Sequence, residues 1–491
     1  MRAFAITVFP EPVEPSMAAC LASTIGLMSI GSPVSLLFPK YMPRGLNLFL
    51  RCCIGSMTSA FSTPSGERMS PIMSARLRSS SGSEPSSNPL FSDTMSGPNR
   101  LQVLKGALLS AFEKQTQGGR RIRRGMERIP MARPTWNNEM RLAAVATLDS
   151  KQWVKGAQGS AFGIEFAEYC GALSATPCQN GSSALWAALR IAEIGPGDEV
   201  IVPSFTFISS TTCVLLVGAT PVFVDIEPEY YCLDVEQVRQ AITPKTKAVI
   251  GVHLFGQVYS SELVDLCKKE NLVLIEDAAQ AHGATQTYAD GSTHTAGAMG
   301  DIGCFSFFPS KNMAVGGEGG MLTTTQARFQ DRIFSITNHG RSPDLEAIQL
   351  GSNLRMSEVS AAIGRSQLSH LDQWVTRRRQ NAEKYTAELA THPLLETPKV
   401  RPNTQHSWHQ YCIRTQNPTQ LIAHLDARGI DARRYYTVPC HRQQVYSTHH
   451  QFNDVLHNTD HAAESLVAIP VMHELTADEQ QRIIEALLEY Q

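Results

Sequence analysis

The chain has 491 residues, enough for two or three domains that each have a core of their own. Its 43 basic and 45 acidic residues give a formal net charge of −2, so composition does not indicate binding to nucleic acid or to an anionic membrane. The 11 cysteines include no CxxC pair and no Cys/His cluster at metal-ligand spacing. We therefore expect no metal site, and reduced thiols in a cytoplasmic protein.

Residues 1–125 differ in composition from the rest of the chain. They are rich in Ser, Pro, Met and Arg and include SARLRSSSGSEPSSNP, a composition typical of a loose chain. The uncharged stretch 17–38 is long enough to span a membrane, but Pro33, glycines and serines interrupt it, so we do not expect a span or a signal peptide. We expect residues 1–125 to be a disordered extension or the product of an upstream start codon.

From Met126 onward, strand patterns alternate with helical ones. Such alternation predicts right-handed βαβ units and a mainly parallel sheet with helices on both faces. The expected helices are 137–148, 160–170, a helix opened by NGSS, 235–241 and 261–270, and the expected strands are 199–202, 221–224, 248–252, 273–276, 301–308 and 320–324.

After residue 355 the pattern changes. Residues 356–390 are largely helical, and a strand at 410–414, a helix at 420–428 and a final helix at 476–490 with a Thr N-cap follow. We therefore expect a large α/β domain at 126–370 and a smaller C-terminal α+β domain at 371–491.

Candidate ligand-binding residues fall at the ends of the expected strands, where open parallel sheets bind their ligands. Ser182 and Ser183 follow an Asn-Gly turn at a helix start, which suits an anion and a simple N-cap equally well. In PSFTF, Phe205 or Phe207 can stack on a flat ligand, although core packing is the commoner fate of a Phe.

A carboxylate and a lysine complete this set. Asp277 ends the apolar run VLIED, and Gln280 follows closely; a buried Asp needs a cation or hydrogen bonds, and a helix N-cap is the alternative. Ser306 and Lys311 come 29 and 34 residues after Asp277, and Gly-Gly-Glu-Gly-Gly follows the lysine. A phosphate cradle, an aromatic stacker, a strand-end Asp and a lysine are the protein parts that hold pyridoxal phosphate (PLP).

The order of these motifs resembles that of the DegT/DnrJ-type nucleotide-sugar aminotransferases. The resemblance covers 366 of the 491 residues, from about Met126 to the end. It implies the aspartate aminotransferase fold (PLP fold type I), with a mainly parallel seven-stranded type of sheet in the large domain. The matching stretches are NGSSAL, GDEVIVPSFTFISS, GATPVFVDI, VHLFGQ, IEDAAQAHGA, GDIGCFSFFPSKNMAVGGEGG, NHGR, GSNLRMSEVSAAIG and IPVMHELT.

The resemblance implies a role for each candidate residue. Lys311 would be the Schiff-base lysine, Asp277 would pair with the pyridine nitrogen, and Gln280 would lie near the phenolic oxygen of the ring. Phe207 would stack on the ring. The phosphate would be held by Ser182, the backbone of Ser183, Ser306, and Asn353 from a second subunit.

The implied function is transamination. An amino acid donor, expected to be glutamate, would pass its amine to a keto-sugar nucleotide in a homodimer with shared active sites. Two alternatives remain open at this point: another PLP reaction such as sugar dehydration, and a non-catalytic regulator on the same scaffold. The histidines His253, His339 and His441 occur in family-like stretches and are given no catalytic role.

Overall fold

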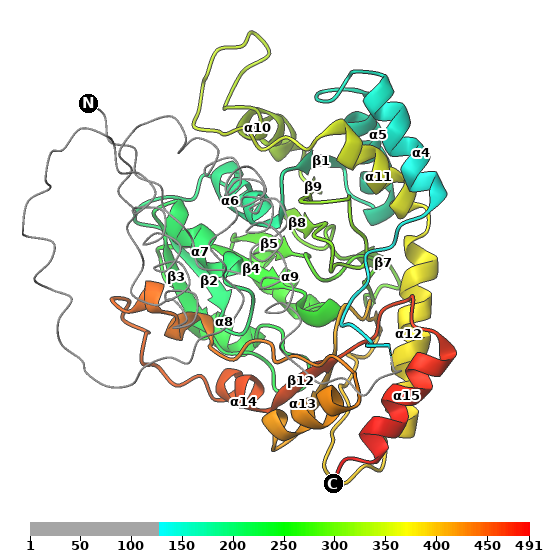
Figure 1. Ribbon diagram of the computed structural model, residues 1–491. Coiled ribbons are helices and arrows are strands. Elements are labelled where there is room, and N and C mark those ends of the chain that lie inside the picture. Colours follow the sequence, from blue (N-terminus) through cyan, green and yellow to red (C-terminus); the bar gives the residue numbers. More distant parts are fainter. Residues whose placement is uncertain (1–126) are drawn as a thin grey trace, which may run out of the picture. The chain divides into compact units, whose positions relative to one another are not determined.

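The computed structural model describes residues 127–491, so the expectations for residues 1–125 lie outside the described part of the chain. A seven-stranded sheet with strand order β1-β9-β8-β5-β4-β2-β3 forms its centre (Figure 1). Strands β3, β2, β4, β5 and β8 are parallel neighbours, and β9 is antiparallel to both β8 and β1. This confirms the expected mainly parallel sheet. The strands are β1 Ser174–Cys178, β2 Glu199–Pro203, β3 Thr220–Val224, β4 Thr246–Val252, β5 Val273–Asp277, β8 Ile302–Ser306 and β9 Gly320–Thr324.

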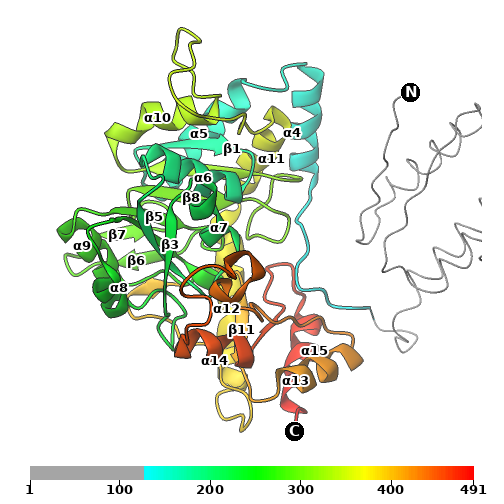
Figure 2. The ribbon, with the colours of Figure 1, turned by 90° about the vertical axis from the view of Figure 1, so that its left-hand side faces the viewer.

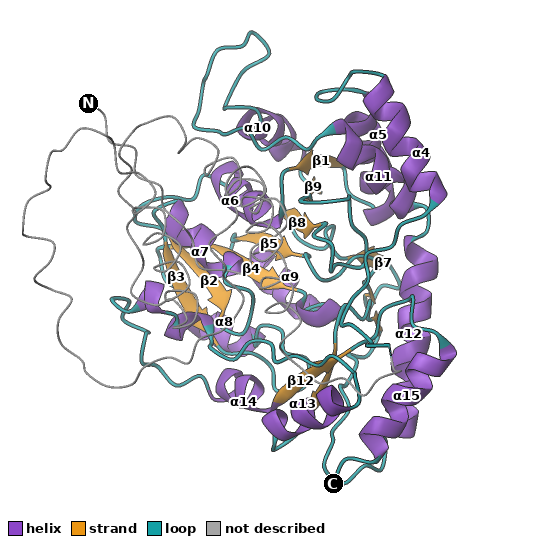
Figure 3. Cartoon of the chain, in the orientation of Figure 1, coloured by secondary structure: helices purple, strands orange, loops and turns teal. Residues whose placement is uncertain are grey.

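Helices cover both faces of this sheet (Figure 3). The strands therefore bury apolar side chains on both faces, as a parallel sheet requires. In β2, Val200 and Val202 join one apolar cluster, whereas Ile201 joins the other. The first cluster includes side chains from α6 Gly181–Ile191, α7 Ser209–Leu216 and α10 Ala327–Thr337. The second includes side chains from α4 Asn138–Asp149, α5 Ala157–Cys170, α8 Val235–Ala241, α9 Ser261–Lys269 and α11 Glu358–Leu368.

The C-terminal elements are built around a long helix, α12 Leu371–Glu388, which runs from the α11 end of the molecule down beside α15 (Figure 2). A third apolar cluster joins α12 to a two-stranded antiparallel sheet, and includes Tyr385, Leu425 and Ile484. The elements of this part are β11 Tyr411–Arg414, α13 Pro418–Ala427, α14 His457–Ser465, β12 Leu466–Ile469 and α15 Ala477–Leu488. The capping box of Thr476 and Glu479 begins α15, as the expected Thr N-cap requires.

A small three-stranded sheet links this part to the large sheet. Its central strand β6 (Thr285–Thr287) pairs with β7 (Thr293–Thr295) and with β10 (Thr404–Gln405), all antiparallel. The division at residues 370 and 371 stays a prediction, although it falls where α12 begins.

Several strands and α-helices are absent from the sequence-based expectations: β1, β6, β7, β10, β12, α7, α10 and α14. The expected strand 301–308 is also shorter, since β8 ends at Ser306 and Phe308 is exposed in the following turn. Within residues 127–491 no helix has both the length and the apolar composition that crossing a membrane requires. The eight cysteines of the same residues are all buried and unpaired.

Candidate active site

Lys311 lies in the turn after β8, with its amide N–H donating to the Phe308 carbonyl at 2.8 Å. The side chain is half-buried, and its Nζ has no hydrogen-bond or ion-pair partner among the described residues. Burial lowers the pKa of Lys311 to about 8, against a smaller opposing effect of Asp277. An ordinary lysine has a pKa of about 10.4, so Lys311 is closer to the neutral amine that acts as a nucleophile or base.

Asp277 is the last residue of β5 and is 6% exposed. Its Oδ2 accepts a hydrogen bond from Ser210 Oγ at 2.6 Å, and its Oδ1 accepts one from the Ala279 amide at 3.2 Å. The carboxylate therefore has hydrogen bonds on both oxygens, as a buried charge requires. It does not cap a helix, because the residues after it form a turn.

Gln280 and Phe207 both neighbour Tyr436. The Gln280 side chain accepts from the Phe255 amide at 2.7 Å and donates from Nε2 to the Tyr436 hydroxyl at 2.9 Å. The Tyr436 ring lies 6.5 Å from that of Phe207, which is 54% exposed and presents a free face. Phe205 is fully buried in the core, so of the two Phe residues Phe207 is the one available to stack on a ligand. Tyr436 is a site residue that the sequence reasoning missed.

Three of the four residues expected to hold phosphate, Ser182, Ser183 and Ser306, lie together at the start of α6. Ser182 is exposed there, with its Oγ 2.6 Å from Ser209 Oγ at the start of α7. Ser306 ends β8 beside it: a Cβ on Gly181 would lie 2.8 Å from the Ser306 Cβ. The starts of α6 and α7, each with a serine hydroxyl, thus lie together with Ser306 at the end of β8. This arrangement is suited to an anion. Ser209 was not among the expected residues.

One detail of this group differs from the expectation. The Ser183 amide donates to Asn180 Oδ1 at 2.8 Å, because Asn180 is the N-cap of α6. It is therefore already engaged, and the amides of Gly181 and Ser182 have no acceptor among the described residues. The N-cap interpretation thus holds for Asn180, and anion binding by the amides of Gly181 and Ser182 stays a prediction.

The glycines after Lys311 explain how the loop approaches this turn. A Cβ on Gly320 would lie 2.5 Å from the Asn180 carbonyl carbon, and Gly316 has a φ of +78°. In contrast, a Cβ on Gly317 would meet nothing within 4 Å. Only part of the glycine cluster is thus required for close packing and positive φ.

Asn353 lies outside this group in the single chain. It is exposed, forms a backbone bridge with Asn338, and has no hydrogen bond to any other expected site residue in the described part of the chain. Its role in a second subunit stays a prediction.

A buried carboxylate next to Asp277 fixes the surrounding loops. Glu276 accepts hydrogen bonds from the amides of Met299 (2.8 Å) and Gly300 (2.7 Å) on Oε1, and from the Gly297 amide (2.8 Å) on Oε2. His253 Nε2 lies 2.8 Å from Oε2, and His253 Nδ1 accepts from the Tyr259 amide at 3.3 Å, so the ring proton is on Nε2. His253 is therefore structural, and Glu276, like Tyr436 and Ser209, was not among the expected residues.

Two further buried histidines lie in the electrostatic neighbourhood of Lys311. Burial and then the charge of Lys311 lower the pKa of His282 to about 3, and the same two causes hold the pKa of His409 well below its ordinary value. Both imidazoles are therefore neutral near pH 7, and neither adds a positive charge next to the lysine.

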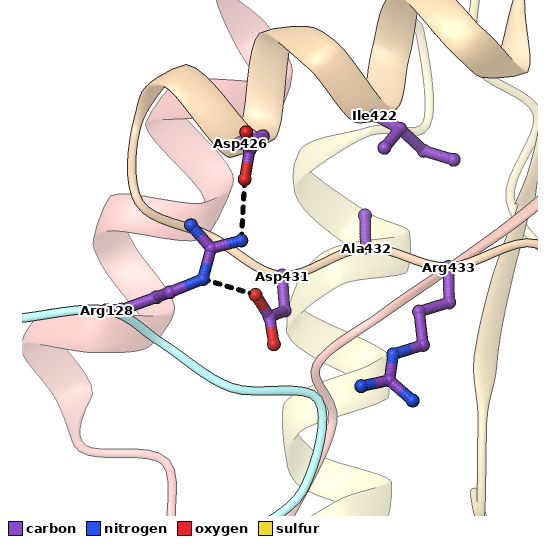
Figure 4. A pocket seen from close by; sticks show the side chains of 6 residues that line it. All are labelled: Arg128, Ile422, Asp426, Asp431, Ala432 and Arg433. Atoms are coloured by element: carbon purple, nitrogen blue, oxygen red, sulfur yellow. Dashed lines mark hydrogen bonds and ion pairs between the residues drawn. The ribbon is translucent and has the colours of Figure 1, made fainter. Parts of the chain in front are cut away.

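A cavity of about 290 Å³ lies elsewhere, in the C-terminal part (Figure 4). Arg128 forms ion pairs across it with Asp426 at 2.6 Å and with Asp431 at 2.5 Å. Ile422, Ala432 and Arg433 complete its lining, and none of the expected site residues belongs to it. The expected site residues thus lie at the carboxyl ends of β5 and β8 and at the start of α6, and not in this cavity.

The residues at the sheet edge fit PLP. The amine of Lys311 is uncommitted, the Asp277 carboxylate is buried and oriented, and Phe207 offers an exposed ring face. The hydroxyls of Ser182 and Ser306 and the open amides of α6 suit a phosphate. When bound, PLP supplies an aldehyde that takes up amino groups and a ring that withdraws electrons.

The chain is similar to known proteins over most of its described part. The model of the DegT/DnrJ/EryC1/StrS aminotransferase family matches residues 134–488. The chain is 39% identical over 337 residues to UDP-N-acetyl-3-dehydro-alpha-D-glucosamine 3-aminotransferase of Acidithiobacillus ferrooxidans, covering 68% of this chain and 89% of that protein. It is 37% identical over 350 residues to dTDP-3-amino-3,4,6-trideoxy-alpha-D-glucose transaminase of Streptomyces venezuelae, covering 71% and 91%.

Solved structures give the same result. Streptomyces venezuelae DesV has a TM-score of 0.71 at 35% identity, covering 74% of this chain and 98% of that chain. Bacillus subtilis NtdA with bound cofactor PMP has a TM-score of 0.67 at 25% identity, covering 75% and 86%. The fold is that of the fold type I aminotransferases, and the cofactor is pyridoxal 5′-phosphate. The chain belongs to the DegT/DnrJ/EryC1/StrS aminotransferase family.

Proposed function

We propose that this PLP-dependent aminotransferase converts a keto-sugar nucleotide to an amino-sugar nucleotide, with glutamate as the amino donor. The observation that carries the proposal is Lys311, a half-buried lysine without a charged partner in hydrogen-bonding contact whose pKa of about 8 suits proton transfer near neutral pH. The substrate class is supported by the relatives, which are named for UDP, dTDP and GDP sugars.

Each residue of the site has a separate task in this proposal. Lys311 would hold the cofactor, and its amine, with a pKa of about 8, would accept and return a proton at the reacting carbon. Asp277 would pair with the pyridine nitrogen and favour its protonated form. Gln280 would interact with the phenolic oxygen, and Phe207 would stack on the ring. Ser182, Ser306 and the start of α6 would anchor the phosphate.

We also propose that the enzyme is a homodimer in which Asn353 of one subunit reaches the phosphate held by the other. The exposure of Asn353 in the single chain supports this assignment. The cytoplasm is the proposed compartment, because the buried thiols show no pairing in residues 127–491. A large domain up to residue 370 and a smaller one after it remain part of the proposal.

The experiment separates the two half-reactions. Protein loaded with PLP is mixed with glutamate, and we expect one 2-oxoglutarate per active site and loss of the visible absorbance band of the bound cofactor. Excess glutamate is then removed, keto-sugar nucleotides carrying UDP, dTDP or GDP are added, and the amino-sugar product is detected by mass spectrometry. Lys311→Ala is expected to lack both reactions. Wild-type protein that takes up PLP but gives no amino sugar from any of the three groups would overturn the substrate assignment.

A regulatory role is the second candidate, since a relative at 37% identity from Geobacillus stearothermophilus is named pleiotropic regulatory protein. The glutamate half-reaction distinguishes the two, because a regulator without catalysis leaves the cofactor unchanged. A different PLP reaction, such as sugar dehydration, would release water from the sugar and leave no amine on the product.

A further inference from the structure

Two hydroxyl side chains form a hydrogen-bond chain that ends on Asp277. Thr206 Oγ1 lies 2.9 Å from Ser210 Oγ, and Ser210 Oγ lies 2.6 Å from Asp277 Oδ2. Thr206 is 3% exposed, Ser210 is fully buried, and Asp277 is 6% exposed. The proposed function gives neither hydroxyl a task.

The chemistry of the three groups fixes the direction of both hydrogen bonds. An ionised carboxylate only accepts, so Ser210 must give its single hydroxyl proton to Asp277. Ser210 Oγ can then only accept from its other neighbour, so Thr206 Oγ1 is the donor. Aligned hydrogen bonds of this kind strengthen one another away from water.

The chain joins elements that are far apart in the sequence. Thr206 precedes the stacking residue Phe207 in the loop after β2, Ser210 lies in the first turn of α7, and Asp277 ends β5. The Ala279 amide holds the other carboxylate oxygen at 3.2 Å. Hydrogen bonds to both oxygens thus fix the orientation of the Asp277 carboxylate. One of them, from Ser210, is connected through Thr206 to the loop that carries Phe207.

We propose that Ser210 and Thr206 are positioning residues that act on the pyridine nitrogen of the cofactor through Asp277. This inference rests on the proposed function, in which Asp277 faces that nitrogen. Ser210 stabilises the ionised carboxylate of Asp277 and holds it in one orientation. In that orientation the carboxylate can accept a hydrogen bond from the protonated ring nitrogen. Thr206 orients the Ser210 hydroxyl and has a smaller effect in the same direction.

The test compares two cofactors that differ only at the ring nitrogen. Dissociation constants of the apoenzyme are measured for PLP and for 1-deazapyridoxal phosphate, in which a C–H replaces that nitrogen. Ser210→Ala is expected to weaken PLP binding by about tenfold to a hundredfold, the worth of a hydrogen bond to a charged group. Binding of the deaza cofactor is expected to change by less than about threefold, because it has no nitrogen for Asp277 to pair with. Thr206→Val is expected to give a smaller loss that is again specific to PLP.

The matched control is Thr212→Ala. Thr212 is in the same helix, and its hydroxyl donates to the Ile208 carbonyl at 3.1 Å, not to the chain that ends on Asp277. We expect this variant to bind both cofactors as the wild type does. In an Asp277→Asn background, Ser210→Ala is expected to have no further effect specific to PLP.

The outcomes separate this inference from the proposed function. Wild-type protein that does not bind PLP overturns both. Wild-type protein that binds PLP overturns the positioning role alone if a Ser210→Ala variant with the wild-type midpoint of thermal unfolding loses both cofactors equally or neither. A folding defect in Ser210→Ala would reduce both affinities, and thermal unfolding of the apo forms measures it directly.

Discussion

Lys311 differs from an ordinary surface lysine in burial and in electrostatics. It is half-buried, and within residues 127–491 Asp277 is the one charged group with an appreciable effect on its pKa. The buried imidazoles of His282 and His409 stay neutral beside it. These surroundings disfavour the ammonium form by desolvation without adding a second cation. The lysine is thereby an available amine at a pH where most lysines are protonated.

The first prediction concerns the pH dependence of this amine. Because the pKa of Lys311 is lowered to about 8, the neutral fraction in the apoenzyme rises as pH increases through 8. The rate at which pyridoxal modifies Lys311, trapped by borohydride and followed by mass spectrometry, should therefore rise with a midpoint near pH 8. Since Asp277 raises this pKa, Asp277→Asn should move the midpoint to lower pH. A midpoint near 10.4, that of an ordinary lysine, would contradict the desolvation argument.

The second prediction concerns Glu276, whose two oxygens each accept two hydrogen bonds from donors. The Gln side chain of Glu276→Gln has nearly the same shape as Glu. Whichever way the Gln amide is turned, its NH₂ group points at a backbone N–H that donates to Glu276 in the wild type. We expect a loss of about 3 kcal/mol in the free energy of unfolding by urea, since buried donors are left unpaired. The exposed Glu262→Gln is the control and should stay within about 0.5 kcal/mol of the wild type. Equal stability of the two variants would show that the Glu276 network is not a stabilising element.

The sequence predicts the site residues that end strands better than those that depend on tertiary contact. Asp277 and Ser306 end β5 and β8, and these ends are visible as apolar runs followed by polar residues. Tyr436 and Ser209 reach the site only through folding over long sequence distances, so no local pattern marks them. The Ser183 amide donates to Asn180, the N-cap of α6, and this competition with the expected phosphate contact has no mark in the sequence.

At the scale of elements, missing local signals explain the missed helices. In α14, Asp225 accepts from the amides of Asn458 (2.9 Å) and Thr459 (2.8 Å), so the helix start is stabilised by a carboxylate more than 200 residues away. In α7 the sequence SSTTCVLL has weak helix propensity, and burial of Cys213 and Val214 compensates for it. The strands of the parallel sheet were predicted well because their apolar runs are continuous.

The third prediction separates two glycines of one loop. In Gly320→Ala the new Cβ would lie 2.5 Å from the Asn180 backbone, which cannot move without displacing the start of α6. We expect a lower midpoint of thermal unfolding and PLP binding weakened at least about tenfold, because that helix start is the proposed phosphate anchor. In Gly317→Ala the Cβ meets nothing within 4 Å, so stability and affinity should match the wild type. Similar behaviour of the two variants would contradict the close approach.

At the scale of the whole molecule, the fourth prediction concerns residues 1–125. The family model begins at residue 134, and the matched relatives are covered over about nine-tenths of their length. Expression from Met126 should therefore give protein with the full stability, PLP affinity and aminotransferase activity of the complete chain. Loss of folding or activity on this truncation would show that the extension is part of the enzyme.

The last prediction tests whether two copies of the chain share each active site. If Asn353 acts in the partner's site, Lys311→Ala and Asn353→Ala are defects in different halves of one site. Both variants should be inactive or strongly impaired alone, but mixing them with subunit exchange creates heterodimers in which one site has both native residues. Random pairing places half of the chains in heterodimers with one of two sites intact, so about a quarter of the wild-type activity should return.

The control for this prediction is a mixture of Lys311→Ala with Asp277→Ala. Both residues lie in one subunit's half of the site, since Asp277 contributes to the pKa of Lys311 within a single chain. In a heterodimer of these two variants, one active site lacks Lys311 and the other lacks Asp277, so activity should not return. Recovery in the control but not in the Asn353 mixture, or full activity of Asn353→Ala alone, would rule out the shared site. Recovery in the Asn353→Ala mixture and not in the control would assign the exposed Asn353 side chain to the active site of the partner subunit.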